Sequence, residues 1–169
     1  MNKTAIRNFI VISFISIIVS RLLPHPPNFT STIAVAFYLP ALFGMQYMIV
    51  ALSAFIVSDL IIGTHALLIF TWGSLIITSL LSKFFSKFPY RLVGIVISCI
   101  IFYIISNFGV WLLSDLYSKD SIGLINCYIM AIPFLQNSLI GSILISLLIE
   151  VIITSKLSKN FIKSINSNF

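Results

Sequence analysis

Ionisable side chains are rare in this chain, and the few that could do chemistry stand at the ends of long apolar runs. Four of them lie near the ends of consecutive runs: Arg21, His25, Asp59 and His65. An ionisable group at the centre of a membrane helix is unfavourable by roughly 2.5–3.5 kcal/mol, so each one needs a partner or a wet cavity. The charges of Arg21 and Asp59 therefore predict either a structural ion pair or a pair of groups that orients a bound polar ligand.

An amide and an indole lie close together in the segment SNFGVWLLSDLY, at residues 106–117. Asn107 and Trp111 are four residues apart, which places them on one face of a helix. An unpaired amide nearly two turns inside a membrane helix is unfavourable, so Asn107 is expected to meet another helix or a ligand. Trp111 by itself is also typical of a residue at the bilayer interface.

A third polar group falls in SIGLINCYIMAIPFLQN, at residues 121–137. Its part GLINCYIMAIPF, residues 123–134, is longer than a turn, too short to span a bilayer and apolar enough to enter the interface, so we predict a lid or re-entrant element there. The whole segment contributes Cys127, Tyr128 and Asn137 as candidate ligand-binding residues, and Asn28 joins them from the segment RLLPHPPNFT. Cys127 with a histidine could hold a soft metal, although a cysteine in apolar surroundings is also typical of inert packing; we assign no metal site.

Signatures of catalysis are missing. The sequence has no HExxH, GxSxG, P-loop or GxGxxG motif, and its four acidic residues leave little for paired-carboxylate chemistry. We therefore expect a protein that is not an enzyme.

The composition indicates the solvent around these residues. The chain has 169 residues, of which 59% are hydrophobic and 8% charged, and its mean hydropathy is +1.13. Soluble domains carry about 25% charged residues, so the sequence predicts an integral membrane protein that forms one domain over residues 1–169. The net charge is +6, and the basic residues lie in short loops beside apolar runs. Orientation in a membrane explains this placement, so the expected partner is the lipid bilayer and not nucleic acid.

The apolar runs predict an all-α, polytopic helix bundle with about six transmembrane helices. Charge, proline or glycine separates them into residues 5–23, 32–45, 47–63, 66–82, 92–114 and 134–155. The second and third runs could instead form one long kinked helix. That helix would measure about 48 Å at 1.5 Å per residue, too long for a hydrocarbon core of about 30 Å, so a tight turn at Gly44 is favoured.

Lysine and arginine predict the orientation. With six spans, two basic residues fall on one side, Arg21 and Lys119, and eight on the other, Lys3, Arg7, Lys83, Lys87, Arg91, Lys156, Lys159 and Lys163. The richer side is expected to be cytoplasmic. This predicts a multi-pass membrane protein with both termini in the cytoplasm. The candidate site residues then share the external level. Glu150 lies near the other level, where a lysine such as Lys156 is its simplest partner.

Four strings carry a family resemblance: RLLPHPPNFT, SDLIIGTH, SNFGVWL followed by LY, and GLINCYIMAIPF. Together they resemble an uncharacterised family of small bacterial six-helix membrane proteins, and the resemblance covers nearly the whole chain. That family in turn resembles, more distantly, the substrate-binding S components of energy-coupling-factor (ECF) vitamin transporters. This resemblance implies six helices, cytoplasmic ends, an outward-facing vitamin pocket and an ECF-type energising module as partner. S components carry small residues spaced by three on the first helix, often alanines, to dock the coupling subunit; this chain departs from that pattern and offers only Ser13, Ser16 and Ser20 there.

Two functions follow as expectations. The first is binding and uptake of a small-molecule substrate that is vitamin-like or, as in solitary relatives of the S components, of cobalamin type. The second is a structural or assembly membrane protein whose external loops bind a protein partner. A cavity large enough for a ligand favours the first, and a filled external face favours the second. The sequence names no cofactor.

Overall fold

The computed structural model describes residues 3–155, and this part of the chain is all-α, with no strand. Seven α-helices and two short 3-10 helices follow one another as α1 (Lys3–Leu22), α2 (Thr32–Phe43), η1 (Met45–Tyr47), α3 (Met48–Ile62), α4 (Leu68–Leu81), η2 (Ser82–Phe84), α5 (Tyr90–Leu113), α6 (Ser121–Met130) and α7 (Ile132–Thr154). The basic residues expected at the C-terminal end, Lys156, Lys159 and Lys163, lie outside the described residues.

The expectation of six helices is wrong, because the described residues form seven. Each of the six predicted runs contains one α-helix, and the seventh, α6, forms in the segment predicted to be a lid or re-entrant element. A local signal starts α6: Asp120 has an extended backbone and its carboxylate accepts the backbone N–H of Gly123 at 2.7 Å. This is the N-cap arrangement that satisfies an otherwise unpaired donor of the first turn.

Among the described residues 3–155, three helices are long and apolar enough to cross a membrane: Met45–Ile62, Tyr90–Leu113 and Ile132–Thr154. The run predicted as a span at residues 32–45 does not reach this length. Its helix, α2, has 12 residues, which is about 18 Å at 1.5 Å per residue and short of a hydrocarbon core of about 30 Å. Residues 31–40 are all buried, and a helix that is apolar all round is typical of a protein interior.

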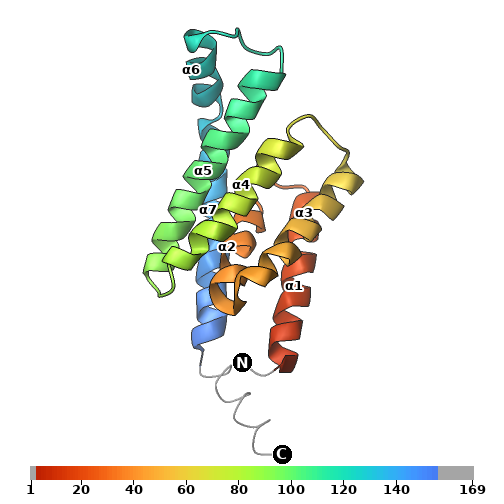
Figure 1. Cartoon of the computed structure of the whole chain (residues 1–169), viewed down its shortest axis with the longest axis vertical. Coiled ribbons are helices and arrows are strands. Elements are labelled where there is room, and N and C mark those ends of the chain that lie inside the picture. The colour runs from red at the N-terminus through yellow and green to blue at the C-terminus, as the bar shows by residue number, and fades with distance from the viewer. Residues whose placement is uncertain (1–2, 156–169) are drawn as a thin grey trace, which may run out of the picture.

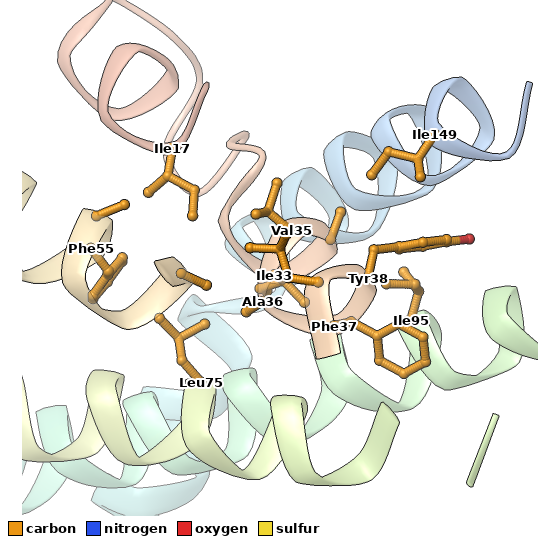
Figure 2. Packing of buried hydrophobic residues seen from close by; sticks show 14 of the residues in the cluster. Ile17, Ile33, Val35, Ala36, Phe37, Tyr38, Phe55, Leu75, Ile95 and Ile149 are labelled. Atoms are coloured by element: carbon orange, nitrogen blue, oxygen red, sulfur yellow. The ribbon is translucent and has the colours of Figure 1, made fainter. Parts of the chain in front are cut away.

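The short helix α2 is the centre of the bundle. It packs against α1, α3, α4, α5 and α7, and Figure 1 shows the longer helices arranged around it. Figure 2 shows its side chains meeting those of the surrounding helices, with Leu75 and Ile95 on one side and Ile17 and Ile149 on others. Because α2 has apolar neighbours all round, it forms the core instead of a membrane-facing wall.

Small residues let the neighbouring helices approach α2 closely. The Ser79 hydroxyl of α4 donates to the Ala36 carbonyl of α2 at 2.8 Å. Gly94 of α5 leaves room for the Phe37 ring, since a Cβ there would lie 2.5 Å from the ring. Close approach through small residues is the usual basis of helix association in membranes.

The helix ends separate into two levels. The start of α1, the start of α5 and the end of α7 lie toward the lower end of Figure 1, and the α3–α4 and α5–α6 connections lie toward the upper end. We call the upper level the cavity end, because the cavity described below lies there, and the lower level the basic end. Arg7, Lys83 and Lys87 are placed at the basic end by their elements.

A buried ion pair joins three helices near the basic end. Arg91 of α5 donates to both carboxylate oxygens of Glu150 of α7, at 2.6 and 2.8 Å, and Tyr38 of α2 donates to the same carboxylate at 2.8 Å. The expected partner Lys156 lies outside the described residues, and within them the Glu150 carboxylate pairs with Arg91. Arg91 of α5 reaches this carboxylate because α5 packs against α7, a contact between distant segments that the linear sequence does not reveal.

The outer surface is apolar on all the long helices. Exposed large apolar side chains include Ile12 of α1, Leu60 of α3, Ile69 of α4, Val93 of α5 and Val151 of α7. Soluble monomers rarely expose contiguous apolar surface of this extent.

Candidate ligand-binding cavity

A cavity of about 290 Å³ opens among the helices at the cavity end of the bundle. Six polar residues line it from the helices: Arg21, Thr32, Thr71, Ser106, Asn107 and Ser138. Three more come from the connections: Asn28, Thr30 and His65. The apolar part of the wall is Ile33, Phe55, Leu67, Phe102, Val110 and Phe134. The cavity thus combines apolar walls with several polar groups, which is typical of small-molecule sites.

Arg21, at the end of α1, is held by α3. Its Nη2 donates to Asp59 Oδ1 at 2.6 Å, and its Nη1 donates to the Phe55 carbonyl at 3.0 Å and to the Ser58 hydroxyl. The guanidinium carbon also lies 3.8 Å from the centroid of the Phe55 ring. The ion pair between the first and third helices therefore forms, and Arg21 reaches the cavity wall while Asp59 lies behind it.

Asp59 itself is closed to a ligand. Its second oxygen, Oδ2, accepts the indole N–H of Trp72 from α4 at 2.7 Å, and the residue is 1% exposed. Asp59 does not line the cavity wall. Its contribution to the site is its charge and its fixed bonds to Arg21 and Trp72.

The proline-rich connection between α1 and α2 has a defined shape. The Phe29 N–H donates to the Pro26 carbonyl at 3.0 Å, and Asn28 has a positive φ of 64°. Proline followed by asparagine at positive φ is typical of a type II turn. Asn137 of α7 donates from Nδ2 to the Pro27 carbonyl at 3.0 Å, which ties this connection to the last helix. The turn puts Asn28 into the cavity wall.

The two histidines are placed differently. His25 donates from Nδ1 to the carbonyl of Pro26 at 2.7 Å and is not part of the cavity wall. His65 lies in the α3–α4 connection, which leaves α3 through Gly63 at φ 120° and lines the cavity. The Leu67 N–H donates to His65 Nδ1 at 3.2 Å. An imidazole that accepts at Nδ1 and is neutral carries its proton on Nε2.

Asn107 of α5 is buried, at 8% exposure, and lines the cavity. Its amide Nδ2 donates to the Tyr103 carbonyl one turn earlier, at 2.8 Å. Its side-chain oxygen has no hydrogen-bond donor among residues 3–155. Asn107 therefore meets its own helix through one end of the amide, and the other end is available to a ligand.

Three of the sequence candidates lie around α6 and do not line the cavity: Trp111, Cys127 and Tyr128. Tyr128 Oη donates to the Ile104 carbonyl at 2.9 Å, and Cys127 Sγ donates to the Asn107 carbonyl at 3.4 Å. Trp111 Nε1 donates to the Ser118 carbonyl at 2.9 Å. The bonds of Tyr128 and Cys127 attach α6 to α5, and the bond of Trp111 ties the α5–α6 connection to the end of α5.

The cavity wall takes no residue from α6, whereas Phe134, near the start of α7 and in the segment predicted to be a lid, lines it. The movement of this segment over the cavity stays a prediction. Burial raises the pKa of the Cys127 thiol and of the Tyr128 phenol above their ordinary values. A thiol with a raised pKa is a poor metal ligand and a poor nucleophile. Cys127 packs against α5.

Metal ligands do not gather in the described part of the chain. Within residues 3–155 there is no group of three histidine, cysteine, aspartate or glutamate side chains that could hold an ion. Cys99 and Cys127 are both free and buried.

Several members of the site were not among the residues expected from the sequence. Thr71, Ser106 and Ser138 sit inside apolar runs, where hydroxyls are too common in membrane-type helices to single out. Trp72 had a usable signal, because an indole N–H in the middle of an apolar run needs a buried acceptor. Asp59 is that acceptor.

The fold and the cavity together define an all-α protein with an apolar outer surface, a buried central helix and a polar cavity at one end. The chain belongs to the Family of unknown function (DUF6580), whose profile matches residues 2–160. No curated protein and no solved structure matches the chain.

Proposed function

We propose that this chain is a polytopic protein of the bacterial cytoplasmic membrane that binds a small molecule at its external face for uptake. The apolar outer surface of the long helices supports the membrane location. The positions of Arg7, Lys83 and Lys87 at one level support a cytoplasmic basic end and an external cavity end.

The observation that carries the proposal is the cavity of about 290 Å³ with polar groups in its wall. Small-molecule sites typically measure about 300–1,000 Å³, so the volume is at the small end of this range. A water molecule in the liquid takes about 30 Å³, so the cavity holds roughly ten waters or a ligand with a similar number of non-hydrogen atoms. We therefore propose a ligand of that size rather than one of cobalamin type, whose macrocycle is larger.

The proposed relation to S components concerns the binding role. In α1, Ser16 and Ser20 each lie within hydrogen-bond distance of the Ser31 hydroxyl, at 3.3 and 3.1 Å. These small residues pack α1 against the start of α2. An energising module of ECF type would dock on another face of the bundle.

Native mass spectrometry of the full chain, purified from bacterial membranes in detergent, tests the proposal. A small molecule should co-purify with the wild type and be released by mild activation. Ser106→Phe fills the cavity from α5 and should abolish this mass, whereas Ile104→Phe, at an exposed position of the same helix, should retain it. A wild type without any bound small molecule, or a mass that survives in Ser106→Phe, contradicts the proposal and favours a structural or assembly role.

A further inference from the structure

We infer that the cavity selects an uncharged polar ligand that carries an amide on an aromatic ring or heterocycle, because the charge in its wall is already balanced inside the protein. The inference rests on the proposed binding function and specifies its ligand class. It follows from the hydrogen bonds of Arg21, Asp59 and His65 and from the free polar atoms beside them.

The ionisable groups in the cavity wall leave no net charge for a ligand to balance. Of the described residues that line the cavity, only Arg21 and His65 have ionisable side chains. Arg21 is paired with Asp59 at 2.6 Å. The geometry at His65 suits the neutral imidazole, because a protonated ring could not accept the Leu67 N–H at Nδ1. The cavity therefore offers no unbalanced charge to a ligand.

A charged ligand is disfavoured by this arrangement. An anion beside Arg21 would also sit near the Asp59 carboxylate, which is fixed by Arg21 and Trp72 and cannot turn away. A cation would meet the Arg21 guanidinium at the wall. Moving either ion out of water without a free counter-charge is strongly unfavourable.

The wall nevertheless offers hydrogen bonds. A guanidinium has five N–H groups, and three of those of Arg21 donate to Asp59, Ser58 and the Phe55 carbonyl, which leaves two for a ligand. His65 can donate from Nε2. A ligand carbonyl or ring nitrogen would accept these protons.

Acceptors face the same space. The Asn107 amide uses Nδ2 within α5 and leaves its oxygen free. Ser106 donates its hydroxyl proton to the Phe102 carbonyl at 2.6 Å, and Thr71 donates to the Leu67 or Leu68 carbonyl, so their oxygens remain as acceptors. The N–H₂ of an uncharged carboxamide would donate to such oxygens, which a carboxylate could not do.

Aromatic rings flank these groups. Phe55, Phe102 and Phe134 come from three different helices and line the cavity. Their faces and edges suit a flat ring of the ligand. Donors, acceptors and rings thus fit a primary amide on a small aromatic ring or heterocycle, and the volume allows roughly ten non-hydrogen atoms.

Three probes of matched ring and size test the charge selection on the full chain in lipid nanodiscs by isothermal titration. They are pyrazine-2-carboxamide, which is uncharged, pyrazine-2-carboxylate and 2-(aminomethyl)pyrazine as its ammonium. The wild type should bind the carboxamide at least tenfold more tightly than either charged probe. Asp59→Asn leaves Arg21 unbalanced while keeping an acceptor for it, and should shift the preference at least tenfold toward the carboxylate. Asp115→Asn, in the exposed α5–α6 connection, is the control and should behave as the wild type.

Two results of the titration overturn the inference. One is a wild type that binds the carboxylate or the ammonium as tightly as the carboxamide. The other is a wild type that does not bind the carboxamide at millimolar concentration. If Asp59→Asn does not yield a monodisperse protein, the comparison of the three probes on the wild type decides alone. A co-purified molecule in the mass spectrum that proves to be charged would overturn the ligand class and leave the binding function standing.

Discussion

Replacing Gly94 by alanine should destabilise the bundle, whereas the same replacement at Gly73 should not. A Cβ at Gly94 would lie 2.5 Å from Phe37 Cζ and 2.9 Å from Phe85 Cγ, whereas carbon atoms in contact are normally about 3.5–4.0 Å apart. The Phe37 ring is fully buried and has no free direction in which to move. Overpacking of this kind costs about 1–3 kcal/mol.

Gly73 is the matched control. It lies inside α4, and a Cβ there would meet nothing within 4 Å. Alanine is favoured over glycine inside a helix by about 1 kcal/mol at both positions, so the difference between the two variants isolates the overpacking of about 1–3 kcal/mol.

Unfolding of each purified variant in mixed micelles of increasing SDS fraction, followed by circular dichroism, measures this difference. Equal midpoints for Gly94→Ala and Gly73→Ala would show that α5 does not pack against the central helix as described.

Three further predictions concern the two ends of the bundle. Glu150→Leu should destabilise the folded bundle by about 3–5 kcal/mol in the same SDS assay, because it leaves the charge of the buried Arg91 guanidinium without its carboxylate partner. Glu150→Gln should destabilise it less. The double variant Arg91→Leu with Glu150→Leu should recover part of the loss. At Asp120 a backbone N–H of α6 and a serine hydroxyl lower the pKa of the carboxyl, so its cap contributes above the ordinary carboxyl pKa and is lost as pH falls through the lowered value. Amide exchange in the first turn of α6, corrected for the intrinsic pH dependence, should therefore be equal at pH 7 and 5 and faster only below about pH 4, and faster exchange already at pH 5 would contradict this. In a background without native cysteines, Ser118→Cys should react with an impermeant thiol reagent added outside cells and Ser86→Cys should not; the reverse pattern would invert the proposed topology.

Much of the helical framework is predictable from the sequence. The runs at residues 92–114 and 134–155 became α5 and α7 within two residues at each end, because long apolar segments bounded by charge or proline have few alternatives to a helix. The interruption between α2 and η1 at Gly44 was also predictable, and the φ of 107° at Gly44 is one that glycine adopts readily. Helix α6 was not predicted, although Asp120 three residues before Gly123 is a capping signal that could have been used.

Apolarity alone could not separate lipid-facing from buried helices. The run at residues 32–45 is as apolar as its neighbours, yet α2 is too short to cross and is enclosed by five other helices. Its burial depends on Gly94 and Ser79 of distant segments, which let those helices approach it. Such contacts have no periodic signal in one sequence.

The sequence by itself determined which groups have to find partners, because Arg21, Asp59 and Asn107 could not remain unpaired beside such apolar runs. Only the tertiary structure decided which partners they found. Packing of α1 and α4 against α3 gave Asp59 both Arg21 and Trp72 and removed its carboxylate from the cavity. The same packing left Arg21 at the cavity wall, and the Asn107 oxygen reaches that wall from α5. The physical reason is that a side chain's partners are set by which helices lie side by side, and that arrangement arises from the summed fit of many small and large residues around α2.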